Sequence, residues 1–210
     1  MALTTFVKVG QLTNLSDARY CAGMGVALLG FNTEPGTVHY VDPEKFREIS
    51  EWVAGVAFAA EFKEASAGTI ERLLPEYPVD YIQTDRADQL EALEQLELPL
   101  ILRLYISETT DVQLLDGLLQ QHAHQVAYFL LETAGDAPLS AEVLAAIHAL
   151  SKQYPLLSAL QIEAATVLEL LERYPLGGIA LQGGVEIKTG FKTFDEMAEV
   201  LEVLEVDEAY

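Results

Sequence analysis

Eight short, almost continuously apolar runs alternate with longer amphipathic segments along the 210-residue chain. Strands of a parallel sheet that is covered on both faces have this composition. The segments between them repeat apolar residues with the period of a helix, as Val143, Ile147 and Leu150 do. Eight strand–helix units in a chain of this length predict an α/β fold, namely a single (β/α)8 TIM barrel formed by residues 1–210. The predicted strands are residues 5–9, 26–31, 55–60, 79–83, 100–106, 126–132, 156–160 and 178–181.

Residues that favour helix starts precede several of the amphipathic segments. Asn14 and the Asp42-Pro43 pair place a side-chain acceptor or a proline where the first helical turn needs it. The predicted helices span 14–23, a segment opening at 42, and 66–76, 87–96, 111–121, 140–154, 163–174 and 194–204. By periodicity, Trp52 is predicted in the core and His148 on a helix surface.

The charge of the chain restricts its partners. It has 33 acidic and 12 basic residues, a net charge of −21. A field of this sign repels nucleic acid and anionic membranes, so we expect neither as a partner. A small phosphorylated or carboxylated ligand at the barrel mouth remains compatible, because a few cations and backbone amides suffice to hold it.

Cysteine content and hydropathy narrow the class of protein further. The single cysteine, Cys21, excludes a disulfide framework and thiolate zinc sites, and its place in a helix predicts a small buried hydrophobe. Residues 1–10 lack the apolar core of a signal peptide, and no apolar run is long enough to span a bilayer. We therefore expect a cytoplasmic protein.

Barrel enzymes carry their reactive groups at the C-terminal ends of the strands. Four carboxylates fall near such ends, those of Glu34, Glu61, Asp85 and Glu132. Clustered carboxylates can bind a hard divalent cation. In so acidic a chain they are more typical of a solvated acidic rim, and we expect no metal site.

Residues 7–18, VKVGQLTNLSDA, resemble the opening V-K-I-C-G-[IL]-T-N-x-x-D-A of the phosphoribosylanthranilate isomerase family. Further similarities lie at residues 81–83, 129–133 and 184–195. The resemblance implies a one-domain barrel of tryptophan biosynthesis, a monomer or homodimer that acts without a cofactor. It also implies an Amadori rearrangement of N-(5-phosphoribosyl)anthranilate, which needs a general acid, a general base and a phosphate anchor.

At the positions that match the family's site residues, this chain keeps some of the family's residue types and lacks others. The family's acid corresponds to Glu132, but its cysteine base corresponds to Gly10, which cannot take a proton. Phosphate binding maps to Gly183 and Gly184, whereas the glycine turn after strand seven is Leu160-Gln161-Ile162. The arginine that binds anthranilate corresponds to His39, a weaker carboxylate partner. Further predicted substrate contacts are Lys8, Gln83, Asp85 and Arg103.

Three hypotheses follow from these substitutions. The first is a degenerate family member that binds a small anionic ligand with little or no isomerase activity. The second is an active isomerase with Glu132 as acid and Asp85 or Glu34 as a substituted base. The third is a different reaction, or a structural or partner-binding role. For Glu132 an ion pair with Lys8 or Arg103 is the alternative to an acid role, and for His39 packing on Tyr40 is the alternative to ligand binding.

Overall fold

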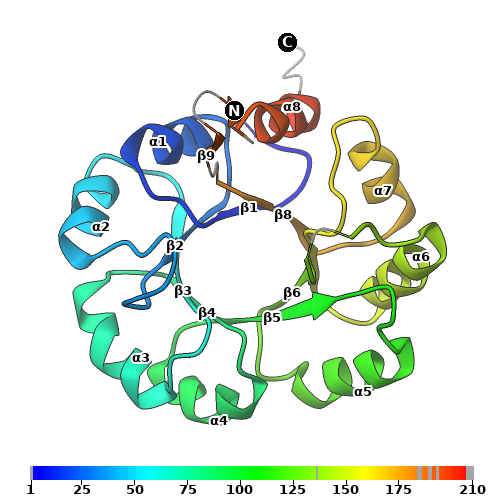
Figure 1. The fold of residues 1–210 in the computed structure, drawn as a ribbon, viewed down its shortest axis with the longest axis horizontal. Helices are drawn as coiled ribbons and strands as arrows, with labels where there is room; N and C mark the ends of the chain where they lie inside the picture. The colour runs from blue at the N-terminus through cyan, green and yellow to red at the C-terminus, as the bar shows by residue number, and fades with distance from the viewer. Residues whose placement is uncertain (1, 136, 184–185, 189–190, 193, 207–210) are drawn as a thin grey trace.

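The structure, a computed structural model, describes residues 2–206 except 136, 184–185, 189–190 and 193. Eight parallel strands follow one another in chain order around a closed barrel, and β8 pairs with β1 to close it (Figure 1). The helices form a ring around the barrel, as the (β/α)8 prediction requires, so the predicted fold is confirmed. The strands are β1 (Val7–Gly10), β2 (Leu28–Asn32), β3 (Ala57–Phe62), β4 (Tyr81–Thr84), β5 (Leu100–Ile106), β6 (Tyr128–Thr133), β7 (Leu156–Ser158) and β8 (Gly178–Gln182).

The helices begin where capping residues were predicted. The Asn14 and Asp42 side chains accept hydrogen bonds from the backbone N–H groups of Asp17 and Lys45. Several predicted helices end earlier than expected, because residues 74–76, 94–96 and 150–152 form 3-10 turns. The helices are α1 (Leu15–Gly23), α2 (Pro43–Ser50), α3 (Ala67–Leu73), α4 (Leu90–Leu93), α5 (Val112–His122), α6 (Ala141–Ala149), α7 (Val167–Arg173) and α8 (Phe194–Leu204).

Five strands, β1 to β4 and β6, begin two residues later than predicted. The preceding residues, such as Val26 and Val126, are buried in the helix layer before strand pairing starts, so their hydropathy resembles that of a strand. The shift places Glu61 inside β3 and not in the loop after it. An antiparallel pair that was not predicted, β9 (Glu186–Lys188) and β10 (Phe191–Lys192), follows β8.

The barrel interior has an apolar lower part and a polar mouth. The lower part is filled by inward-facing Leu28, Ala59, Ile101, Leu130, Leu157 and Ala180. Nearer the C-terminal strand ends, the buried inward-facing residues are Glu61, Gln83 and Arg103. Side chains of the helix ring pack outside the barrel in two separate hydrophobic clusters. The first contains residues of α3, α4, α5 and α6, and the second contains residues of α1, α2, α7 and α8.

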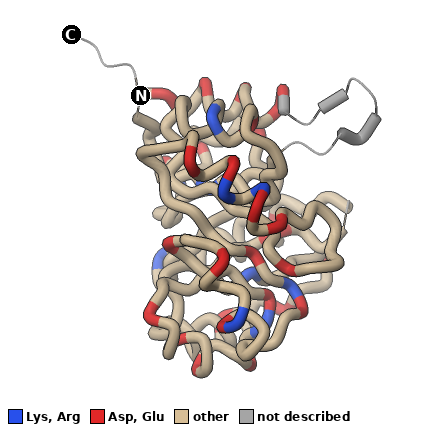
Figure 2. The backbone as a smooth tube through the Cα atoms, turned by 90° about the vertical axis from the view of Figure 1, so that its left-hand side faces the viewer, with Lys and Arg blue, Asp and Glu red and all other residues tan. Residues whose placement is uncertain are grey.

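Charged residues are spread over the whole molecule. In Figure 2, Asp and Glu positions far outnumber Lys and Arg positions and occur along the whole length of the fold. No described helix is long and apolar enough to cross a membrane.

For two residues, Trp52 and His148, the predicted burial is wrong. Trp52 is 71% exposed, because α2 ends at Ser50 and the helical stripe that predicted its burial does not reach it. His148 is only 3% exposed, and its Nε2 lies 2.8 Å from Ser158 Oγ on β7. The helix face that carries His148 therefore packs on the barrel. Cys21 is fully buried, as predicted.

The buried His148 makes the stability of the chain depend on pH. Burial lowers the pKa of His148 to about 4, against about 6.5 in an unfolded chain. Between these values the unfolded state binds a proton that the folded state does not, so stability falls as the pH falls from 6.5 towards 4, by roughly 3 kcal/mol in full. Urea unfolding measures the free energy of unfolding at pH 7 and at pH 4.5. We expect the difference between the two values to be smaller in His148→Gln than in the parent chain. His124 is exposed, and the control variant His124→Gln should show the same difference as the parent chain. Equal pH dependence in both variants would contradict the assignment.

Candidate active site at the barrel mouth

Lys8 and Glu61 form a buried ion pair between β1 and β3. The Lys8 ammonium contacts Glu61 Oε1, and the two side chains are 2% and 6% exposed. The second carboxylate oxygen, Oε2, accepts the backbone N–H of Gln11 at 3.1 Å. Both oxygens of Glu61 therefore have donors, as a buried carboxylate requires.

The Glu61 carboxylate lies over Gly10 and Gly30. A Cβ atom added at Gly10 would lie 2.7 Å from Glu61 Oε1 and 2.9 Å from Lys8 Nζ. A Cβ atom added at Gly30 would lie 2.0 Å from Oε1 and 2.8 Å from Nζ. At distances this short, the Glu61 carboxylate or the Lys8 ammonium would have to move to make room for the added atom. Glycine at both positions is therefore what gives the ion pair its space, and the ion pair occupies the space that a side chain at position 10 would use.

Arg103, on β5, connects two further carboxylates. Its guanidinium donates to Asp85 through Nε at 2.8 Å and Nη2 at 3.0 Å, which is a bidentate contact. Nη1 donates to Glu132 Oε2 at 3.3 Å, while Glu132 Oε1 accepts from the Gln182 side chain. The Tyr105 hydroxyl also donates to Asp85, at 3.2 Å. The sequence offered Lys8 or Arg103 as the ion-pair partner of Glu132. In the structure the partner is Arg103, and Lys8 pairs with Glu61 instead.

Burial raises the pKa of two of these carboxyl groups, Glu132 and Asp85. It raises the pKa of Glu132, the charge of Glu61 raises it further, and Arg103 partly offsets the rise. Burial also raises the pKa of Asp85, against the opposing effect of its hydrogen bonds from Arg103 and Tyr105. A carboxyl group with a raised pKa can hold and donate a proton nearer neutral pH, which is the property of a general acid.

The mouth is not the solvated acidic rim that the sequence predicted. Glu61, Asp85 and Glu132 are bound to Lys8 or Arg103, so three carboxylates face two cations. Glu34 lies outside this network, and its Oε2 accepts the backbone N–H groups of residues 63 and 64 at 2.6 and 3.0 Å. Among the described residues, no group of three or more His, Cys, Asp or Glu is arranged to hold a metal ion.

Little space remains at the centre of the mouth. The cavity lined by Lys8, Glu61, Gln83, Arg103 and Glu132 measures about 20 Å³, the volume of roughly one water molecule. Gln83 is fully buried there, and neither polar atom of its amide has a hydrogen-bond partner in the described part of the chain. A sugar phosphate does not fit this space unless the charged side chains move.

A larger hollow of about 540 Å³ lies beside the centre, above β2 and β3. His39 lines it, in a left-handed backbone conformation with φ of 62°. Arg103 and Tyr105 also line it, and Lys63 adds a cation that the sequence did not predict as a site residue. The predicted ligand contacts at His39 and Arg103 therefore border one hollow.

Of the two glycines predicted to bind phosphate, Gly183 and Gly184, the structure describes only Gly183. The backbone N–H of Gly183 donates to the carbonyl of Gly10 at 2.7 Å, so it is engaged with β1. Gly184 lies outside the described residues. After β7, Leu160 is buried, and Gln161 has a φ of 51° while its Oε1 accepts the N–H of Leu139. Phosphate binding at these positions stays a prediction.

The closed barrel, with charged groups converging at its mouth, defines a (β/α)8 protein. The model of the N-(5'-phosphoribosyl)anthranilate (PRA) isomerase family matches residues 7–203, so the chain belongs to this family. The resemblance inferred from the sequence is thereby confirmed. The comparison with curated proteins gave no match.

Solved structures of the family share the fold. The phosphoribosylanthranilate isomerase of Thermus thermophilus is 20% identical, with a TM-score of 0.75, and that of Thermotoga maritima is 17% identical, with a TM-score of 0.76. In both comparisons the alignment covers 95% of this chain and 98% of the other. A family structure in complex with reduced 1-(o-carboxyphenylamino)-1-deoxyribulose 5-phosphate is 18% identical over 95% and 98% of the chains, with a TM-score of 0.73.

Sequence reasoning did not identify the central role of Glu61, which it had grouped with three other acidic residues. The feature of the sequence that could have indicated this role is the pair of glycines, Gly10 and Gly30. Both are inward-facing positions on adjacent strands, where absent side chains indicate that another group approaches closely.

Proposed function

We propose that this member of the phosphoribosylanthranilate isomerase family binds a small phosphorylated or carboxylated ligand at the barrel mouth and catalyses little or no isomerisation. The observation that carries the proposal is the position of Glu61. Its carboxylate and the Lys8 ammonium occupy the space above Gly10, where the family resemblance places the catalytic base. Because both Glu61 oxygens accept hydrogen bonds, Glu61 is a poor substitute base.

The hollow beside the centre is the proposed ligand site. Its volume of about 540 Å³ falls in the range of small-molecule pockets. Lys63 forms no ion pair among the described residues, and His39 lies on the same hollow. Together with Arg103 they supply donors for a carboxylate or phosphate. The carboxylates of Glu61 and Glu64 on the same hollow favour a ligand of low negative charge.

One observation favours the second candidate, an active isomerase. Burial raises the pKa of Glu132, and this carboxyl group lies at the end of β6 where the family's acid is expected. The two bases considered from sequence are both engaged. Asp85 is held by Arg103 and Tyr105, and Glu34 by backbone N–H groups. Because neither Asp85 nor Glu34 is free to act as a base, the described residues favour the first proposal.

The proposal predicts that the purified chain is a very slow isomerase. A missing general base costs about 10²- to 10⁴-fold in rate. We expect the rate of rearrangement of phosphoribosylanthranilate, followed by chromatography, to lie at least this far below that of the Thermus thermophilus enzyme assayed alongside. Glu132→Gln should leave any residual rate unchanged. A rate comparable with that enzyme and lost in Glu132→Gln would establish the active isomerase instead.

Ligand binding is tested separately by calorimetry with anthranilate and with inorganic phosphate. The proposal expects saturable binding of at least one of them, weakened in Lys63→Gln. The exposed Lys45 on α2 offers the matched control, and Lys45→Gln should bind as the parent chain does. No binding at millimolar concentration would favour a structural or partner-binding role.

A further inference from the structure

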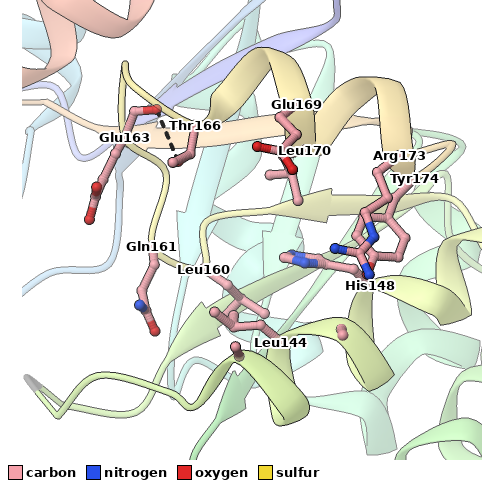
Figure 3. Close-up of a pocket in the computed structure, with 12 residues that line it drawn as sticks. Leu144, His148, Leu160, Gln161, Glu163, Thr166, Glu169, Leu170, Arg173 and Tyr174 are labelled. Atoms are coloured by element: carbon pink, nitrogen blue, oxygen red, sulfur yellow. Dashed lines mark hydrogen bonds between the residues drawn. The ribbon is translucent and has the colours of Figure 1, made fainter.

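A second hollow, of about 330 Å³, lies between α6 and α7, outside the barrel (Figure 3). Its position follows from the packing of the helix ring. Ile147 of α6 belongs to one hydrophobic cluster and Val167 of α7 to the other. Because the two helices are anchored in different clusters, the space between them is not filled by side chains of either.

The hollow has apolar walls and polar ends. Leu144 and Ala145 of α6 face Leu170 of α7, and Leu160 of the segment after β7 also contributes to the walls. Figure 3 shows His148, Arg173 and Tyr174 grouped at one end, and Gln161 and Glu163 at the other. A ligand with an apolar body and one polar end matches this distribution.

The hydrogen bonds of Ser158 determine which nitrogen of His148 carries the proton. Ser158 is fully buried, and its Oγ already accepts the backbone N–H of Leu160 at 3.3 Å. The remaining contact of this hydroxyl is His148 Nε2, at 2.8 Å. The tautomer that accepts at Nε2 gives the buried hydroxyl hydrogen an acceptor, whereas the other tautomer leaves this hydrogen without one. Nε2 is then an acceptor, and the proton of the neutral imidazole lies on Nδ1.

The Nδ1–H group is a donor that lacks a partner. Nδ1 makes no hydrogen bond within the described part of the chain and is not one of its buried atoms without a partner, so solvent reaches Nδ1 although His148 as a whole is 97% buried and lines the hollow. A donor that solvent reaches in this way is open to an acceptor oxygen of a ligand. The hollow is the side from which an acceptor can reach it.

Arg173 supplies a positive charge at the same end. Its guanidinium lies 5.3 Å from the centre of the Tyr174 ring and forms no ion pair with any described carboxylate. An unpaired guanidinium beside an N–H donor is complementary to a carboxylate, which accepts from both. Glu163 and Glu169 on the rim oppose a second negative charge on the ligand.

We propose that the hollow between α6 and α7 is a binding site for a small monocarboxylate with an apolar body. The carboxylate accepts hydrogen bonds from Arg173 and from Nδ1–H of His148. The body packs against Leu144, Leu160 and Leu170. This site is independent of the barrel mouth and of the function proposed there.

Titration of the whole chain with octanoate, monitored by amide NMR signals, tests the proposal. We expect saturable shifts at residues of α6 and α7, and octanamide, the neutral analogue, should bind at least about tenfold more weakly. Arg173→Gln should weaken octanoate binding by a similar factor. The control Arg72→Gln, on the exposed surface of α3, should not change it.

Two further measurements locate the ligand. Ala145→Trp should abolish binding by filling the hollow, whereas Ala146→Trp, on the exposed face of α6, should bind as the parent chain does. Imidazole ¹⁵N signals should show Nδ1 of His148 protonated and shifted by octanoate. The proposal is overturned by the absence of saturable binding at millimolar octanoate, by equal binding of octanamide, or by shifts at mouth residues that persist in Ala145→Trp.

Discussion

Replacing Glu61 with methionine is expected to lower the free energy of unfolding by about 3–5 kcal/mol. The change leaves the Lys8 ammonium, 2% exposed, without its ion-pair partner, and an uncompensated buried charge costs this much. It also removes the acceptor of the Gln11 N–H. Urea unfolding at pH 7 measures the loss.

The double variant separates the charge effect from loss of packing. Removing both charges in Lys8→Met/Glu61→Met should restore most of the lost stability, because buried ion pairs are replaced by apolar residues of similar size at little cost. Glu48→Met on the surface of α2 is the control for the substitution itself and should leave stability unchanged. A single Glu61→Met variant as stable as the parent chain would show that the pair does not carry buried charges.

Restoring the family's cysteine by Gly10→Cys is expected to destabilise the chain by about 1–3 kcal/mol and to yield no isomerase activity. The new Cβ would lie 2.7 Å from Glu61 Oε1, so either the carboxylate or the backbone of β1 has to move. The loss is measured by urea unfolding, and the activity by the rearrangement assay. A large gain of activity from this single change would show that Glu61 yields its position readily and that the remaining machinery is intact.

A double-mutant cycle tests the cause. Combined with Glu61→Ala, the cysteine no longer meets the carboxylate, so the two changes together should cost less than their sum, by about 0.5–3 kcal/mol. Gly117→Ala is the control for adding a side chain to a glycine. Its Cβ on α5 has no neighbour within 4 Å, and the change should stabilise the helix by about 0.5–1 kcal/mol. Strict additivity of Gly10→Cys and Glu61→Ala would contradict the steric explanation.

The sequence predicts which residues lie at the barrel mouth better than it predicts which of them contact one another. The sequence places Lys8 and Arg103 on strands and Asp85 and Glu132 near strand ends, because strands alternate their side chains and end at recognisable loops. The sequence offers an ion pair of Glu132 with Arg103 as one of two alternatives, and the structure contains it. It does not offer the pairing of Lys8 with Glu61, because the two residues lie 53 positions apart and only the closure of the barrel sets their distance.

The sequence by itself determined the eight strand–helix units, the helix caps at Asn14 and Asp42, and membership of the family. These properties are encoded by apolar periodicity, side-chain hydrogen bonds within one turn and local motifs, and all of them act over short stretches of chain. The tertiary structure alone decided that Glu61 fills the space above Gly10 and Gly30, and that α6 and α7 leave a hollow between them. Both depend on how side chains from distant elements share a fixed volume, which no local pattern specifies.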